Sequence, residues 1–159
     1  MLKRLQNVDE AKQCANLMAC SEPWITLGRT FEDSLKILLD SSKEIYLAFE
    51  DNQFAGFIII NMKGAFIGYI QTICIAPEFR GKGLGTKLIQ FAEERIFSET
   101  PNVFMCVSSF NKEAQKLYER LGYEVIGELK NYIVSGYSEI LLRKTIAPLK
   151  NYSPQKKSL

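Results

Sequence analysis

Apolar and polar positions along the chain alternate with helical or extended periodicity in short segments. Apolar residues at helical spacing predict a first helix near 8–20, capped by Asn7 or Asp9. A second helix is predicted near 30–40, where a Thr-x-x-Asp start forms a loose capping box. Further along, the same spacing predicts helices near 84–98 and 111–121, the second of them ended by a glycine.

Seven extended segments complete this pattern. They are predicted at 1–6, 44–50, 53–62, 65–76, 102–108, 123–129 and 138–144. Asp51 and Asn52 suit a hairpin turn between the second and third segments. Because hairpins and crossover helices are mixed along the chain, the sheet is predicted to be mixed as well. We expect an α/β (α+β) domain over 1–146, followed by a basic, proline-containing tail over 147–159 that is flexible or loosely docked.

Composition narrows the functional classes. The 159 residues fit one domain, and 47% apolar with 24% charged residues is an ordinary globular balance. A net charge of +2 is too small to indicate nucleic-acid binding. Neither a signal peptide nor an apolar run of about 18 residues is visible, so a cytoplasmic protein without membrane contact is expected.

Metal-ligand and nucleophile chemistry is also restricted by composition. The chain has no histidine, and its four cysteines form no CxxC pair, so no metal site is expected and the thiols are predicted to be free and mostly buried. Without histidine, the usual Ser-His and Cys-His pairs are excluded. Any catalytic acid or base must come from Tyr, Glu, Asp, Cys, Lys or water.

The densest chemical signal is the stretch RGKGLGT, residues 80–86, which we call the glycine turn. It lies between an apolar strand and an amphipathic helix, and Arg80, Lys82 and Lys87 add positive charge. The first N–H groups of a helix lack internal partners, and glycines let such groups approach an anion. The spacing differs from a P-loop, and the strand order differs from a dinucleotide-binding βαβ unit. A tight turn with solvated charges and a coenzyme A pyrophosphate site remain as interpretations.

Two blocks of the sequence resemble the GCN5-related N-acetyltransferases (GNAT family). The stretch ICIAPEFRGKGLGTKLIQFAEE carries the family's Arg/Gln-x-x-Gly-x-Gly/Ala pattern at Arg80, Gly83 and Gly85. The stretch SSFNKEAQKLYERLGYEVIGEL is similar to its second cofactor block, with Asn111 and Tyr118. Together the two blocks cover about half the chain directly. The segments EPW and NY also resemble the ribosomal-protein alanine acetyltransferase branch, but the closing hairpin differs.

The resemblance implies a fold and a cofactor geometry. The fold is a GNAT-type, mostly antiparallel sheet of about six to seven strands with about four helices, splayed between the fourth and fifth strands. The pantetheine arm of acetyl-CoA would bond to the exposed edge of the fourth strand, and the glycine turn would hold the pyrophosphate. The residues implied in cofactor binding are Ile73, Cys74, Ile75, Arg80, Gly81, Lys82, Gly83, Leu84, Gly85, Thr86 and Asn111.

Catalysis by direct transfer needs a proton donor for the leaving thiolate and a base for the amine. The resemblance implies Tyr118 as the donor, although Tyr118 shares a helix face with apolar residues and is otherwise interpreted as a core tyrosine. The two positions where relatives carry a glutamate base hold Tyr69 and Cys106 here. The carboxylates left as candidates are Glu22, Glu128 and Glu139.

The acceptor is expected to be the primary amine of a small molecule or a peptide N-terminus. A weak base suits an α-amine, with a pKa near 8, better than a lysine-type amine with a pKa near 10.4. By resemblance, the acceptor side includes Trp24, Phe31, Tyr69, Tyr132, Tyr137 and Glu139, which are alternatively loop anchors. The sequence thus predicts an acetyl-CoA-dependent N-acetyltransferase, monomeric or homodimeric. The alternatives are a CoA-binding sensor of the same fold and a nucleotide-binding domain.

Overall fold

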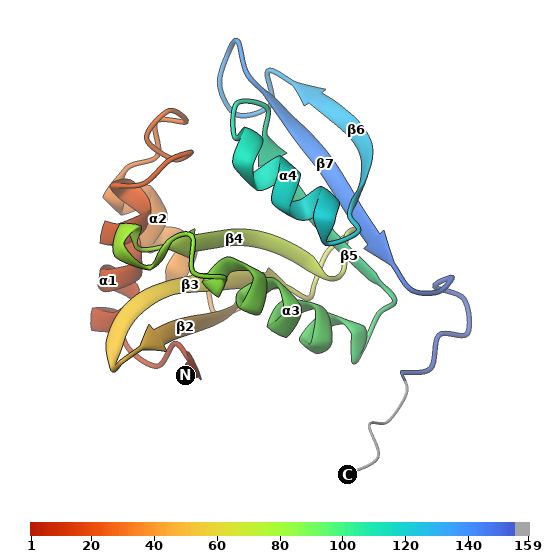
Figure 1. Ribbon diagram of the computed structural model, residues 1–159, viewed down its shortest axis with the longest axis horizontal. Coiled ribbons are helices and arrows are strands. Elements are labelled where there is room, and N and C mark those ends of the chain that lie inside the picture. The colour runs from red at the N-terminus through yellow and green to blue at the C-terminus, as the bar shows by residue number, and fades with distance from the viewer. Residues whose placement is uncertain (155–159) are drawn as a thin grey trace. The chain divides into compact units, whose positions relative to one another are not determined.

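A computed structural model describes residues 1–154 of the chain (Figure 1). Its elements in chain order are β1 (Leu2–Arg4), α1 (Val8–Ala19), α2 (Phe31–Leu38), β2 (Glu44–Glu50), β3 (Gln53–Asn61), β4 (Tyr69–Ile75), a 3-10 turn (Pro77–Phe79), α3 (Leu84–Phe97), β5 (Asn102–Ser108), α4 (Lys112–Arg120), β6 (Glu124–Lys130) and β7 (Ser138–Thr145). The predicted order and type of every helix and strand are confirmed.

The strands are hydrogen-bonded in the order β1-β2-β3-β4-β5-β7-β6. Four of these pairings are antiparallel, namely β1 with β2, β2 with β3, β5 with β7 and β6 with β7. The pairing of β4 with β5 is parallel. β4 and β5 are each seven residues long but pair only at Tyr69–Phe104 and Ile70–Met105. The structure therefore confirms the predicted mixed, mostly antiparallel sheet, with a short parallel pairing between its fourth and fifth strands.

The described chain divides into two compact units. The first unit contains Met1–Ile60 and Gln71–Leu88, and the second contains Asn61–Ile70 and the described residues from Ile89 onward. The chain passes between the units within β3, β4 and α3. A single domain over 1–146 stays a prediction.

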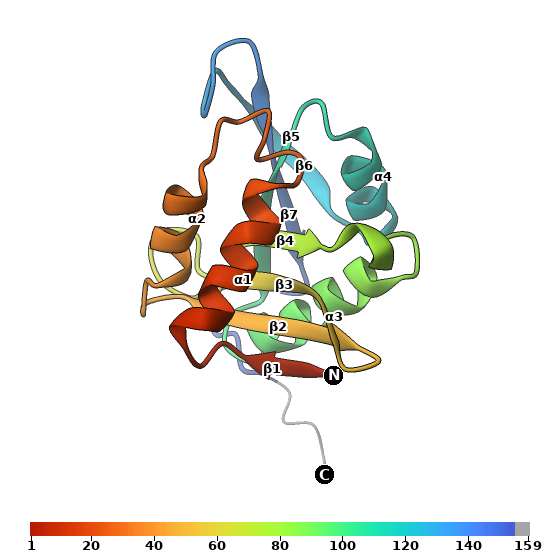
Figure 2. The same cartoon turned by 90° about the vertical axis from the view of Figure 1, so that its left-hand side faces the viewer.

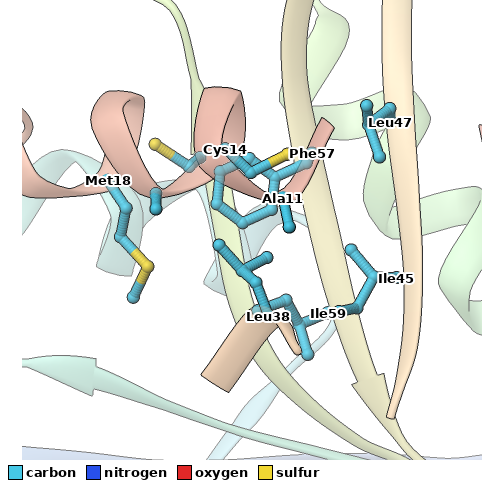
Figure 3. Close-up of a cluster of buried hydrophobic side chains, with 10 residues drawn as sticks. Ala11, Cys14, Met18, Leu38, Ile45, Leu47, Phe57 and Ile59 are labelled. Carbon is cyan, nitrogen blue, oxygen red and sulfur yellow. The ribbon is translucent and has the colours of Figure 1, made fainter. Parts of the chain in front are cut away.

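In the first unit, α1 and α2 cover one face of β2 and β3 (Figure 2). Every third or fourth side chain of α1 is apolar, and these side chains face Phe57 and Ile59 of β3 and Leu38 at the end of α2 (Figure 3). The cluster includes Ala11, Cys14, Ala15 and Met18, all without exposed surface. Burial of this apolar area is the main stabilising contribution to the unit.

Local polar signals set the helix ends of this unit. Of the two predicted caps of α1, the structure selects Asn7, whose Oδ1 accepts a hydrogen bond from the Glu10 N–H at 3.0 Å. The predicted capping box of α2 is present: the Thr30 N–H donates to the Asp33 carboxylate at 3.0 Å, and the Asp33 N–H donates to the Thr30 hydroxyl at 3.1 Å. Both caps satisfy N–H groups that a helix leaves without partners.

The second unit is built on the antiparallel strands β5, β7 and β6, with α4 beside β6 and β7 (Figure 1). The Gln115 side chain on α4 donates to the carbonyl groups of Ser108 and Ser109, both at 3.1 Å, which fixes α4 at the end of β5. An ion pair between Lys144 and Glu93 at 2.9 Å joins β7 to α3. Val103, Met105 and Leu142 form part of the buried interior.

The predicted strand at 65–76 is too long at its N-terminal end, because β4 begins at Tyr69. Gly68 breaks the strand with a φ of +86°, a left-handed conformation that favours glycine. A Cβ at this position would lie 2.5 Å from both the Asn102 carbonyl oxygen and the Ile96 Cγ2. The close approach of two segments distant in sequence therefore sets the start of the strand.

Replacing Gly68 by alanine is expected to lower the free energy of unfolding by about 2–5 kcal/mol. About 1–2 kcal/mol comes from the left-handed backbone, and the rest comes from overpacking against backbone that cannot move freely. Gly64→Ala is the matched control, since Gly64 has a φ of +91° but no atom within 4 Å of the added Cβ. Urea denaturation of both variants measures the difference, and equal losses would show that the close contact has no energetic effect.

Other predictions about the chain have clear outcomes. All four cysteines are free, with Cys14 and Cys74 buried and Cys20 exposed. Across residues 1–154, none of the helices combines the length and the apolar character that a membrane crossing requires. In the predicted tail, the Tyr152 hydroxyl donates to the Phe97 carbonyl at 2.7 Å, and residues 155–159 lie outside the described part.

Candidate functional site

The glycine turn is shaped by two left-handed residues. After the 3-10 turn Pro77–Phe79, Gly81 has a φ of +72° and Gly83 a φ of +82°, and α3 begins at Leu84. A Cβ at either glycine would meet no protein atom within 4 Å, so the space above the turn is open on the protein side. The conformation therefore requires glycine through its backbone angles and not through crowding.

This turn presents unpaired donors at the start of a 14-residue helix. Within the described chain, the backbone N–H groups of residues 81–86 donate no hydrogen bond, and the first one that does belongs to Lys87, which reaches the Gly83 carbonyl at 3.1 Å. The positive end of the α3 dipole lies at the same place. Consecutive open N–H groups at a helix N-terminus match the chemistry of an anion site, as the sequence predicts.

The cations of this segment have different roles. Arg80 Nε donates to the Ile75 carbonyl at 2.9 Å, and an Arg80 terminal nitrogen donates to the Ser21 hydroxyl at 3.3 Å. Arg80 therefore links the turn to the end of β4 and to Ser21, two residues beyond α1. Lys82 lies over the Phe79 ring at 5.7 Å, and Lys87 pairs with a Glu50 oxygen at 3.4 Å.

The end of β4 supplies the predicted pantetheine residues. Ile73 and Ile75 are half-buried, and Cys74 is buried in the core of the first unit. Burial raises the pKa of the Cys74 thiol to about 12, so the side chain stays protonated near neutral pH and is a poor nucleophile. Any contact of these three residues with a cofactor would use backbone groups, as the resemblance implies.

Helix α4 carries Asn111 and Tyr118. Asn111 is the N-cap, and its Oδ1 accepts from the Ala114 N–H at 3.3 Å, as predicted for the helix start. Tyr118 packs edge-on against Tyr123, with ring centroids 6.1 Å apart and an interplanar angle of 64°. Burial raises the pKa of Tyr118 to about 12, so its hydroxyl keeps its proton at neutral pH. Tyr118 is thus a packed aromatic residue whose hydroxyl is protonated at neutral pH.

In the second unit, four polar side chains of β4, β5 and β7 lie together. The Ser108 hydroxyl donates to Glu139 at 2.6 Å, and Glu139 is only 6% exposed. Burial raises the pKa of Glu139, and the Ser108 hydrogen bond partly opposes that shift. The pKa of Tyr69 is raised first by burial and then by the neighbouring Cys106 thiol, with which the Tyr69 hydroxyl shares a hydrogen bond. We call Tyr69, Cys106, Ser108 and Glu139 the Glu139 cluster.

The other residues predicted on the acceptor side belong to different segments of the chain. Trp24, which follows α1, and Phe31, the first residue of α2, are partly buried against the core cluster of the first unit. Tyr132 is 65% exposed in the loop between β6 and β7. Tyr137 packs edge-on against Phe110 with ring centroids 4.9 Å apart.

The three candidate carboxylates also have different surroundings. Glu22 is exposed and bonds to the backbone and hydroxyl of Thr26, and Glu128 is exposed on β6. Glu139 is the buried one of the three. In residues 1–154, no group of three or more Cys, Asp or Glu side chains is arranged to hold a metal ion.

Sequence reasoning did not identify Ser108 or Ser21 as contributors. Ser108 faces Glu139 because their strands pair in register, and Ser21 meets Arg80 across 59 positions of sequence. Cys106 and Ser108 are two residues apart in a predicted strand and therefore lie on the same face, which was the one sequence signal for the contact of Ser108 with Glu139. No local pattern indicates the second.

Comparisons with known proteins identify related sequences. The GCN5-related N-acetyltransferase 6 of Arabidopsis thaliana, a chloroplastic protein, is 27% identical over 134 residues, covering 79% of this chain and 46% of that protein. The spermidine N(1)-acetyltransferase of Escherichia coli K12 is 31% identical over 77 residues, covering 46% of this chain and 41% of that protein. The chain therefore spans less than half the length of these two relatives.

A solved structure gives the same fold. An aminoglycoside 6'-N-acetyltransferase complexed with coenzyme A superimposes with a TM-score of 0.73 at 18% identity, covering 93% of this chain and 98% of that one. The model of the Acetyltransferase (GNAT) family matches residues 10–123. That match includes the glycine turn and Tyr118, and it covers well over half of the sequence. The chain belongs to the Acetyltransferase (GNAT) family.

Proposed function

We propose that this chain transfers the acetyl group of acetyl-CoA to a primary amine. One observation carries the proposal: the glycine turn leaves the N–H groups of residues 81–86 without partners at the N-terminus of α3. Such donors suit the pyrophosphate of coenzyme A. The likeness to a solved acetyltransferase complexed with coenzyme A supports the choice of this anion over a nucleotide.

The reaction needs no bound metal or separate cofactor. A free amine attacks the thioester carbonyl carbon, a C–N bond forms, and the C–S bond breaks. The products are the acetylated amine and coenzyme A, and the ammonium substrate releases one proton to solvent overall. Backbone N–H groups near Ile73 and Ile75 would polarise the carbonyl oxygen.

Tyr118 is the proposed donor to the leaving thiolate. A thiol has a pKa near 8.5 in water, so a thiolate leaves more readily when a donor stabilises its developing charge. The Tyr118 hydroxyl keeps its proton because burial raises its pKa to about 12. Burial would also raise the pKa of the leaving coenzyme A thiol, so that its thiolate would take up the proton more readily.

The acceptor class follows from the missing carboxylates. By resemblance to the GNAT family, Tyr69 and Cys106 occupy the two positions at which members of that family carry a glutamate base. An α-amine is neutral for about 10% of molecules at pH 7, against less than about 0.1% for a lysine-type amine. We therefore propose a small α-amino compound or a peptide N-terminus. The relatives named for spermidine and aminoglycosides keep polyamines and aminoglycosides as alternatives.

A thiol-release screen tests this function. Acetyl-CoA is incubated with the protein and with alaninamide, N-acetyl-lysinamide, spermidine, kanamycin or a short peptide, and released coenzyme A is measured. We expect release with at least one amine, and a higher kcat/KM for alaninamide than for N-acetyl-lysinamide. Binding of acetyl-CoA without release on any amine would instead support a CoA-binding sensor. Stabilisation by ATP but not by coenzyme A would support a nucleotide-binding domain.

A further inference from the structure

Glu139 is a buried carboxyl group that lacks a cationic partner. Its one hydrogen bond in the described chain comes from the neutral Ser108 hydroxyl at 2.6 Å. No lysine or arginine of residues 1–154 forms an ion pair with it. The next cation on the same face of β7 is Arg143, whose Nε donates to Asn102 at 2.9 Å. A carboxylate buried to this degree is normally paired with a positive charge.

The groups around Glu139 are neutral. Cys106 and Ser108 come from β5, Tyr69 comes from β4, and the residue paired with Glu139 on β6 is Leu129. Both Cys106 and Tyr69 have raised pKa values, first through burial and then through neighbours that include Glu139. At neutral pH, these neighbours therefore leave any negative charge on Glu139 uncompensated.

The cluster lies beside a loop that is open to solvent. Tyr132, in the loop between β6 and β7, is 65% exposed and acts electrostatically on Tyr69. Glu139 is the second residue of β7, next to the end of this loop. Solvent therefore reaches the chain within two residues of Glu139, since Tyr137 at the end of this loop is 42% exposed.

We propose, on the basis of the proposed function, that Glu139 receives the ammonium group of the acceptor and takes one of its protons. The carboxylate accepts the proton from nitrogen, which leaves the neutral amine with the electron pair that attacks the thioester carbon. The proton later passes from Glu139 to solvent and restores the carboxylate. The Ser108 hydroxyl orients the carboxylate by donating to one of its oxygens.

This assignment fits the acceptor class. Burial raises the pKa of the Glu139 carboxyl above its ordinary value, which makes its carboxylate a stronger base. An α-ammonium group, with a pKa near 8, gives up its proton to such a base more readily than a lysine-type ammonium group with a pKa near 10.4. The cluster therefore favours an α-amine, and Tyr69 and Cys106 would line the space around its nitrogen.

Glu139→Gln tests the assignment, with Glu128→Gln on the adjacent strand as the matched control. Glutamine retains an oxygen for the Ser108 hydroxyl but cannot take a proton. We expect kcat/KM for the amine to fall by about 100-fold or more in Glu139→Gln, with the KM for acetyl-CoA unchanged. Glu128→Gln is expected to stay within about twofold of the wild type, since Glu128 is exposed.

The pH profile gives a readout that a structural role would not change. In the wild type, kcat/KM rises with pH as Glu139 loses its proton and again as the amine loses its proton. In Glu139→Gln, only the rise caused by the amine should remain.

The stability of the wild type should fall over the pH range in which Glu139 loses its proton. A raised folded pKa destabilises the protein as pH rises through that pKa, so Glu139→Gln should melt at the same or a higher temperature at pH 8.

A binding measurement separates this proposal from the proposed function. In the presence of coenzyme A, the wild type should bind alaninamide more tightly than its neutral hydroxyl analogue lactamide, and Glu139→Gln should bind both alike. Equal rates, pH profiles and amine affinities in the wild type and Glu139→Gln would overturn the role of Glu139. A wild type that releases no coenzyme A with any amine would instead overturn the proposed function.

Discussion

Replacing Gly83 by valine is expected to weaken acetyl-CoA binding by about 100-fold or more. The φ of +82° at Gly83 disfavours a side chain, and a Cβ there would occupy the open space above the N–H groups of the glycine turn. Each hydrogen bond to a charged group contributes about 1.5–3 kcal/mol. Loss of two such bonds to the pyrophosphate corresponds to the expected change in affinity. Isothermal titration calorimetry with acetyl-CoA measures it.

Gly64→Val is the matched control for this variant. Gly64 is also exposed, has a φ of +91° and has no protein atom within 4 Å of its Cβ position, but it lies between β3 and β4 and outside the glycine turn. Both variants therefore carry similar backbone strain. The control should bind acetyl-CoA like the wild type. Unchanged affinity in Gly83→Val would show that the turn does not hold the cofactor.

Replacing Tyr118 by phenylalanine is expected to lower kcat by about 100-fold or more, the usual range for removal of a general acid. The affinity for acetyl-CoA should hardly change, because the ring and its packing against Tyr123 are retained. The variant lacks the Tyr118 hydroxyl, which keeps its proton at neutral pH because burial raises its pKa to about 12. Steady-state kinetics with the best amine of the screen measures kcat.

Tyr123→Phe controls for loss of a buried tyrosine hydroxyl in the same aromatic pair. Tyr123 is 5% exposed, and its hydroxyl has no hydrogen-bond partner among the residues that the structure describes. Its removal should leave kcat unchanged, since the ring and its packing against Tyr118 are retained. If Tyr118→Phe turned over as fast as Tyr123→Phe, Tyr118 would be a core tyrosine only.

The parts of the fold that the sequence predicted well depend on nearby residues. The caps at Asn7 and Thr30 each act within three residues, and Asp51 and Asn52 both adopt positive φ in the predicted hairpin turn. The start of β4 was predicted wrongly because it depends on contacts of Gly68 with Asn102 and Ile96, far along the chain. Apolar periodicity alone cannot detect such contacts.

The same division applies to the candidate site. The glycine turn was predictable because left-handed residues and open helix N–H groups are properties of a few consecutive positions. The sequence left Glu22, Glu128 and Glu139 as equal candidates, because burial is set by tertiary structure. The partnership of Ser108 with Glu139 needs the register of β5 with β7, which no local pattern encodes.

An NMR titration of ¹⁵N-labelled protein with coenzyme A tests the central claim most directly, since it follows each backbone amide of the glycine turn. We predict that the amide signals of residues 81–86 show the largest shifts, and that Gly83→Val loses them. Coenzyme A that binds while these six amides stay unperturbed would contradict the claim that the turn holds its pyrophosphate.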